Sequence, residues 1–312
     1  MHHVAQSLEF PEHLVPVFAK AIKYEWISLI YVISATIFSF LVMSNSQTMK
    51  TVWLEDLLSI IPPASFLISS KIVLFKPNKN FPYGFHRITS AAYLASSLAL
   101  FILGIYLLID GSFVLYKQER PNIPVISIFG HPIWFGYLMI IALLWSSIPS
   151  TILGKVKVPL AYSLYDKILL ADSKMNKASW MSGFASVLGI IGIGLGFWWA
   201  DAAVGILISV DIIKDGYTHL KQSVLDLLNE VPKSLQNNKT DPLINEVYRL
   251  VSDEAWVKSA TIRFRDEGHV FFGDVIIKPK KNNGTLSQVQ TLHSKIKKHH
   301  WRLHDIVIML TH

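Results

Sequence analysis

Residues 88–109 read ITSAAYLASSLALFILGIYLLI, a stretch without Asp, Glu, Lys or Arg. About 20 apolar residues in a helix cross the roughly 30 Å hydrocarbon core of a bilayer. Similar blocks recur along the 312-residue chain, of which 51% is hydrophobic and only 16% is charged, whereas soluble domains are about 25% charged. This composition excludes a disordered chain, a coiled coil and a soluble nucleic-acid-binding domain. It predicts a polytopic helical membrane protein that contacts the lipid bilayer and no nucleic acid.

The positions of the apolar blocks predict six transmembrane spans, and the basic residues predict their orientation. The spans are expected at residues 26–43, 52–74, 88–109, 133–153, 178–199 and 202–217. Lys and Arg stay on the cytoplasmic side because carrying them across the membrane is costly. One side of the predicted topology carries Lys20, Lys23, Lys71, Lys76, Lys79, Arg87, Lys155, Lys157, Lys167, Lys174 and Lys177, and the other carries Lys50, Lys117 and Arg120. Both termini are therefore expected in the cytoplasm, with the chain in an inner or plasma membrane.

Three regions are expected along the chain: a cytoplasmic arm at 1–25, a transmembrane domain at 26–220 and a cytoplasmic domain at 233–312. In the last region, apolar periodicity predicts helices at 241–254 and 286–299 and strands at 256–264, 269–277 and 306–310. A turn is expected at Asp266-Glu267-Gly268. The predicted fold class is an all-α six-span transmembrane bundle with a small α+β domain of order α-β-β-α-β, ferredoxin-like.

The second predicted span carries an unusual group of oxygen atoms. Glu55 and Ser59 share a helix face, Asp56 lies next to them, and Pro62 and Pro63 each free the carbonyl four residues earlier from helical hydrogen bonding. Carboxylate, hydroxyl and carbonyl oxygens are ligands for a hard cation. The alternative is that both carboxylates lie at the membrane interface and that the prolines only kink the helix. The chain has no cysteine, which excludes disulfides and thiolate metal sites.

A second group of ligands precedes the fifth predicted span. Asp172, Met175, Asn176 and Ser179 have the i, i+3, i+4, i+7 spacing of one helical face. Three of them offer oxygen and one offers a thioether sulfur. The alternative is a solvated helix start, with Asp172 near the positive end of the helix dipole.

Other polar residues offer further candidates. Asp211 lies inside the sixth predicted span, where a carboxylate is typical of a proton path. A second candidate metal site in the C-terminal region consists of His269, Asp274, His293 and His304. The spacing of these residues matches no metal-binding motif. Neither Gly-x-Ser-x-Gly nor His-Glu-x-x-His occurs, so we do not expect an enzyme.

Three motifs carry a resemblance to a known family. Residues 81–87, FPYGFHR, open the third span after a basic loop and resemble the His-Pro-Tyr-Gly-His-Gly-Arg-like run of the cation diffusion facilitator family. Ala171-Asp172 resembles the start of its Ala-Asp-Ala-x-His-x-x-x-Asp segment, and Trp199-Ala200-Asp201-Ala202 resembles its turn into the sixth span. The number of spans and the C-terminal domain match as well, so the resemblance covers nearly the whole chain.

The resemblance implies a homodimeric exporter of divalent metal driven by inward proton flow, with the cation as substrate and no permanently bound cofactor. The four family ligand positions are Glu55, Ser59, Met175 and Ser179. The family usually has Asp or His there, so only Glu55 keeps a strong ligand, and the site is expected to extend to Asp56, Asp172 and Asn176. The alternative is a non-transporting protein with a degenerate metal site, which regulates or binds a partner.

Overall fold

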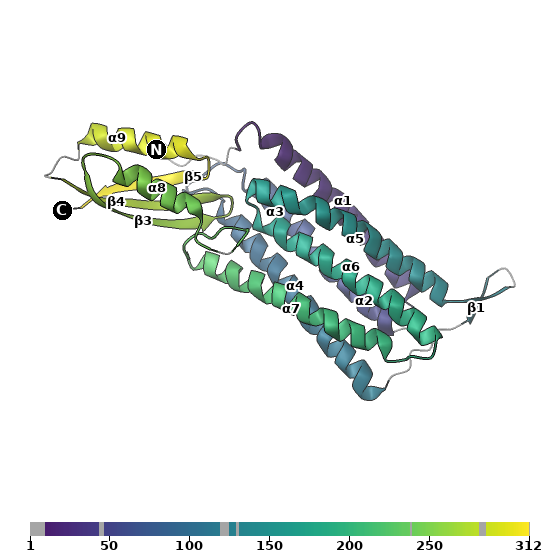
Figure 1. The fold of residues 1–312 in the computed structure, drawn as a ribbon. Coiled ribbons are helices and arrows are strands. Elements are labelled where there is room, and N and C mark those ends of the chain that lie inside the picture. The colour runs from purple at the N-terminus through teal and green to yellow at the C-terminus, as the bar shows by residue number, and fades with distance from the viewer. Residues whose placement is uncertain are drawn as a thin grey trace.

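The molecule consists of a long helical bundle with a small α+β domain at one end (Figure 1). The computed structural model describes residues 10–43, 47–118, 125–128, 131–237, 239–280 and 285–311. The bundle helices are α1 (Val15–Val42), α2 (Gln47–Leu58), α3 (Ile61–Ile72), α4 (Arg87–Lys117), α5 (Gly136–Leu164), α6 (Lys167–Gly194) and α7 (Ala200–Leu227). Among the described residues, four helices are long and apolar enough to cross a membrane: Val15–Val42, Met49–Ile72, Arg87–Lys117 and Gly136–Leu164.

Several helices extend well beyond the apolar blocks that predicted them. Helix α1 begins at Val15 rather than near 26, and α6 begins at Lys167 rather than near 178. The sequence-based boundaries were wrong there because polar residues continue a helix beyond its apolar stretch, wherever they face other helices or water. The basic loop expected between the fourth and fifth spans is consequently a short turn at Tyr165 and Asp166, and its lysines lie on α5 and α6.

The second span is interrupted at the prolines. Helix α2 ends at Leu58 and α3 begins at Ile61, with Pro62 and Pro63 in its first turn. Proline is tolerated in a first helical turn because the amide hydrogen it lacks has no intrahelical acceptor there. The break thus falls at Ser59 and Ile60, just before the two prolines.

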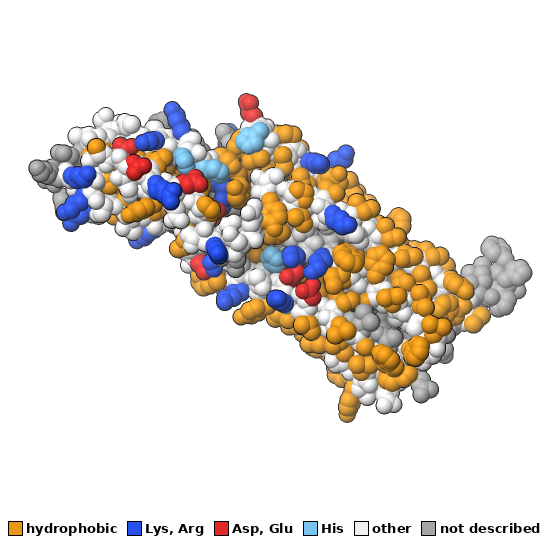
Figure 2. Space-filling model, viewed as in Figure 1, with side chains coloured by type: hydrophobic (Ala, Val, Ile, Leu, Met, Phe, Trp, Pro, Cys, Tyr) orange, Lys and Arg blue, Asp and Glu red, His pale blue; other side chains and the backbone are white. Residues whose placement is uncertain are grey.

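The surface of the bundle is largely apolar. Large apolar side chains such as Ile30, Leu41, Leu188 and Leu207 are exposed on several helices. Figure 2 shows hydrophobic side chains over the bundle, while Lys, Arg, Asp and Glu gather on the C-terminal domain and the adjacent end. A continuous apolar surface of this size is expected of helices that face lipid.

Glycine residues allow α4 and α7 to pack closely. A Cβ atom at Gly216 would lie 2.7 Å from Phe101 Cα, and one at Gly104 would lie 2.8 Å from the backbone nitrogen of Ile213. Small residues at such crossings let helix backbones approach in a membrane, where the hydrophobic effect does not drive helices together.

The C-terminal domain has the predicted α-β-β-α-β order: α8 (Pro242–Ser252), β3 (Val257–Glu267), β4 (Val270–Pro279), α9 (Leu286–His299) and β5 (Leu303–Leu310). The sheet order is β3-β4-β5, with β4 antiparallel to β3 and parallel to β5. Its core includes Val247, Phe271 and Leu292. The predicted turn was too long, because Glu267 still pairs with Val270 and only Gly268, with φ of +78°, and His269 form the turn.

A short hairpin, β1 (Val125–Ile128) with β2 (His131–Trp134), lies at the end of the bundle away from the C-terminal domain (Figure 1). The fourth span was expected to begin at 133, but His131–Trp134 pairs with β1 and the helix begins at Gly136. Apolar strand residues next to an apolar helix were read as one block, because hydropathy does not distinguish the two.

Ion pairs fasten the C-terminal domain to the bundle. Lys167 Nζ lies 2.6 Å from an Asp226 carboxylate oxygen on α7 and 2.8 Å from one of Asp266 on β3. Arg87 at the start of α4 donates to Glu267 at 3.0 Å. These contacts join the sheet to three bundle helices.

Candidate functional site

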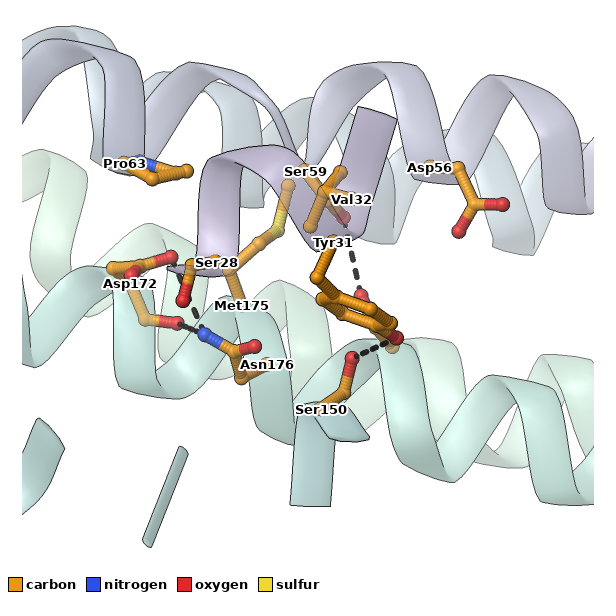
Figure 3. A pocket seen from close by; sticks show the side chains of 11 residues that line it. Ser28, Tyr31, Val32, Asp56, Ser59, Pro63, Ser150, Asp172, Met175 and Asn176 are labelled. Carbon is orange, nitrogen blue, oxygen red and sulfur yellow. Dashed lines mark hydrogen bonds between the residues drawn. The ribbon is translucent and has the colours of Figure 1, made fainter. Parts of the chain in front are cut away.

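A closed cavity lies inside the bundle among α1, the α2–α3 break, α5 and α6 (Figure 3). Six of the seven predicted site residues line it: Asp56, Ser59, Asp172, Met175, Asn176 and Ser179. Ser28, Tyr31, Val32, Pro63 and Ser150 complete the lining. The enclosed space holds about one water molecule, which is also the scale of one dehydrated metal ion.

Asp56 is buried and hydrogen bonded on both carboxylate oxygens. Oδ1 accepts from Ser146 Oγ of α5 at 2.8 Å, and Oδ2 accepts from Ser39 Oγ of α1 at 3.0 Å. Only 3% of Asp56 and 3% of Glu55 is exposed. Both carboxylates are therefore enclosed by the bundle rather than exposed on its surface.

Asp172 is buried as well, and it belongs to an ion-pair network of three helices. Lys157 Nζ on α5 pairs with Asp172 Oδ2 and lies 3.2 Å from Glu25 Oε2 on α1. Asn176 Nδ2 donates to the Asp172 carbonyl oxygen at 2.9 Å. Asp172 is 2% exposed, so the alternative of a solvated helix start is wrong. Figure 3 shows Asp172 beside Asn176, with Asp56 toward the other end of the view.

Two serines close the cavity between the α2–α3 break and α6. Ser59 Oγ and Ser179 Oγ lie 3.1 Å apart, and Ser59 also donates to the Glu55 carbonyl oxygen at 2.9 Å. Met175 lies at the edge of the cavity, and it also packs in an apolar cluster with residues such as Leu103 and Ile212. The chemistry of the lining is therefore mainly that of oxygen ligands.

Glu55 lies beside this cavity rather than in its lining. Its Oε2 accepts from Ser182 Oγ at 2.7 Å, and its Oε1 has no hydrogen-bond partner among the described residues. Ser182 lines a second cavity together with Thr51, Asp110 and Ser186. The Glu55 side chain is thus linked to the second cavity through Ser182, whereas Ser59 of the first cavity bonds only the Glu55 backbone.

Two charged groups beside the cavity were missed by sequence reasoning. Lys157 was placed in a loop, and Glu25 in the terminal arm, yet both are fully buried. A signal existed for Lys157: it follows Ser146, Ser150 and Leu153 at helical spacing, which is one buried face of α5. No comparable pattern marks Glu25.

The other candidates do not form metal sites in the structure. Among the described residues, no group of three or more His, Asp or Glu side chains is placed to hold a metal ion. Asp274 pairs with Arg263 at 2.7 Å, and Asp211 is half exposed and pairs with Lys177 at 2.6 Å. The side chain of Asp201 and the whole of Arg120 lie outside the described residues.

A family model for the cation efflux transmembrane domain matches residues 26–228. The chain belongs to the cation efflux family. The match extends from inside α1 to just beyond α7, so it contains every residue that lines the cavity, while Glu25 lies just before it. Cation efflux proteins are integral membrane transporters rather than enzymes. No curated protein matches the chain.

Proposed function

We propose that this cation efflux protein exports a divalent metal cation from the cytoplasm in exchange for protons, with the closed cavity as its transport site. The supporting observation is that Asp56 and Asp172, from different helices, line one buried cavity with the oxygen ligands of Ser59, Asn176 and Ser179. A carboxylate pair in a membrane bundle is costly unless it pairs with protein groups, protons or a cation. Transported cations and protons provide such partners in turn.

The donor set favours a hard cation over zinc. Carboxylate, hydroxyl and amide oxygens suit Mg²⁺, Ca²⁺ and Mn²⁺, whereas zinc in proteins prefers histidine and thiolate with carboxylate. Among the hard cations, Mg²⁺ dehydrates reluctantly and usually keeps several waters, for which the cavity has no room. Mn²⁺ and Ca²⁺ are therefore the cations to test, Mn²⁺ first.

Competition between protons and metal for the same carboxylates couples the two movements. A carboxylate must be ionised to bind metal, so binding releases protons and acidification releases metal. Rocking of the bundle would expose the site to each side in turn. The Glu55 side chain is hydrogen bonded to Ser182, which lines the second cavity with Asp110, so Glu55 is placed to receive the cation after it leaves the first cavity.

The proposal includes six spans, with α6 and α7 as the fifth and sixth, both termini in the cytoplasm, and a homodimer. Both helices are 28 residues long, more than enough to cross a bilayer. The charged side chains at the end of the bundle beside the C-terminal domain (Figure 2) support a cytoplasmic location of that end.

Transport into vesicles tests the site assignment. Purified protein is reconstituted into lipid vesicles that contain an Mn²⁺-sensitive dye, and Mn²⁺ uptake is followed under an imposed pH gradient. Asp56→Asn, Asp172→Asn and Glu55→Gln should each slow uptake about tenfold or more, which corresponds to roughly 1.4 kcal/mol. Asp253→Asn makes the same chemical change on an exposed residue of the C-terminal domain and should transport normally. Uptake at the parental rate in the Asp56 and Asp172 variants would show that the cavity is not the transport site. An uptake rate that does not depend on the pH gradient would disprove proton coupling.

One observation favours a second function, a non-transporting membrane protein that regulates or recruits a partner. The cavity ligands are already satisfied by protein groups, since Asp172 pairs with Lys157, and Ser59 pairs with Ser179. Equilibrium binding distinguishes the two functions. Saturable micromolar Mn²⁺ binding supports the transporter, and its absence together with inactive vesicles supports the second function.

A further inference from the structure

Lys157 is a buried cation beside the proposed transport site. Its side chain has no exposed surface, and its two anionic partners come from different helices, Glu25 on α1 and Asp172 on α6. A fully buried lysine is rare unless it is paired, and charged groups inside a membrane bundle usually mark an ion path.

The two carboxylates of this network are not equivalent. Asp172 lines the cavity, while Glu25 stands behind it and holds Lys157 from the other side. Ser28, one helical turn after Glu25, lines the cavity with a buried hydroxyl oxygen. Neither Ser28 Oγ nor Glu25 Oε1 has a hydrogen-bond partner among the described residues. This side of the cavity therefore holds unused capacity to bind a cation.

We propose that Lys157 is a tethered cation that competes with the transported metal for Asp172. The inference rests on the proposed function. With the cavity empty, Lys157 neutralises Asp172, which would otherwise be an unpaired buried carboxylate. When the metal ion enters, Asp172 turns to the metal and Lys157 remains with Glu25. Return of Lys157 to Asp172 then displaces the metal, so that affinity is lowered and release is faster.

A purely structural role for the network would have a different signature. If the ion pairs only tie α1, α5 and α6 together, removing either Lys157 or the charge of Glu25 destabilises the protein. Metal binding is then weakened in both variants. In the competition mechanism, changes at Lys157 and at Glu25 shift metal affinity in opposite directions. Removing Lys157 frees Asp172 for metal, whereas removing the charge of Glu25 leaves Lys157 with Asp172 alone.

The test measures equilibrium Mn²⁺ binding and vesicle transport for the full chain and its variants. Lys157→Met should tighten binding about tenfold or more, lowering KM and kcat together, because bound metal is released slowly. Glu25→Gln, which is nearly isosteric, should weaken binding by a similar factor. Lys174→Met is the matched control, because Lys174 lies on α6 with a partly exposed partner, Asp215, and its binding should equal that of the parent.

Each outcome decides the inference. Opposite shifts in the Lys157 and Glu25 variants support it, and shifts in the same direction or no shifts overturn it while the proposed function stands. If Lys157→Met does not fold, Lys157→Gln takes its place, and unchanged or weaker binding in that variant overturns the inference. If the parent itself binds no Mn²⁺ and transports none, the proposed function fails and this inference falls with it.

Discussion

Ser59 Oγ and Ser179 Oγ lie 3.1 Å apart, at two of the four positions where the family resemblance places its ligands. Because both side chains are small and uncharged, the α2–α3 break and α6 meet without repulsion between like charges. The negative charge of the cavity comes instead from Asp56 and Asp172. The departure from Asp or His at positions 59 and 179 therefore changes the site without removing its oxygen ligands.

Restoring a carboxylate at position 179 should strengthen metal binding. We expect Ser179→Asp to bind Mn²⁺ about tenfold more tightly, a gain of roughly 1.4 kcal/mol. The metal-free protein should be less stable, since an additional buried charge lacks a partner. The measurement is Tm with and without Mn²⁺, because a ligand that binds the folded state raises Tm. Ser112→Asp, an exposed position on α4, is the control. An Mn²⁺-dependent rise in Tm no larger than in the parent would contradict the prediction.

Close packing of α4 and α7 predicts a contrast between two glycines on the same helix. Gly216→Ala places a methyl group 2.7 Å from Phe101 Cα, whereas no described atom lies within 4 Å of a Cβ at Gly205. Overpacking costs about 1–3 kcal/mol, so Gly216→Ala should lower Tm. Gly205→Ala should leave it unchanged or slightly raised. Thermal unfolding in detergent measures both, and equal effects would show that this crossing is not tightly packed.

The buried ion pairs of Lys167, which hold the C-terminal domain, should contribute far more to stability than a partly exposed ion pair within the bundle. Lys167→Met leaves Asp226 and Asp266 buried without their cation, and breaking such a buried pair costs about 3–5 kcal/mol. Lys174→Met removes a partly exposed pair with Asp215, worth about 0–1 kcal/mol. Hydrogen exchange in the β3–β4 hairpin should rise in the first variant only. Unchanged exchange after Lys167→Met would mean that other contacts hold the domain.

His300 should make the C-terminal domain sensitive to acid. Burial, and then the nearby charge of Arg302, lower the pKa of the imidazole below its usual 6.5. The neutral ring accepts a hydrogen bond from the Arg302 backbone N–H at 3.2 Å. Because the folded pKa is the lower one, the stability contribution is complete above about pH 6.5 and is lost as the pH falls through the folded value.

The corresponding experiment compares the Tm of the parent and His300→Gln between pH 8 and pH 5. The Tm of the parent should fall more than that of the variant between pH 8 and pH 5. Above pH 7 the Tm of both proteins should change with pH in nearly the same way. Parallel curves throughout would contradict a contribution from His300.

The fold class was largely predictable because its signals are local. Span length and apolar periodicity indicated the bundle helices, and alternation predicted the order of the C-terminal elements. Helix ends were less predictable. Lys167 and Lys174 continue α6 far before its apolar stretch, because their charges are paired with Asp226 and Asp215 of the neighbouring helix. Such pairing is invisible in a hydropathy pattern.

By itself, the sequence determined a membrane bundle, a small α+β domain and two polar helical faces, since each depends on residues a few positions apart. Only the tertiary structure decided how those faces are used. It turned Asp56 into the cavity and Glu55 toward Ser182, and it buried Lys157 between Glu25 and Asp172. Helical spacing specifies which side chains share a face, whereas the partner of each charge depends on packing between helices that lie far apart in the chain.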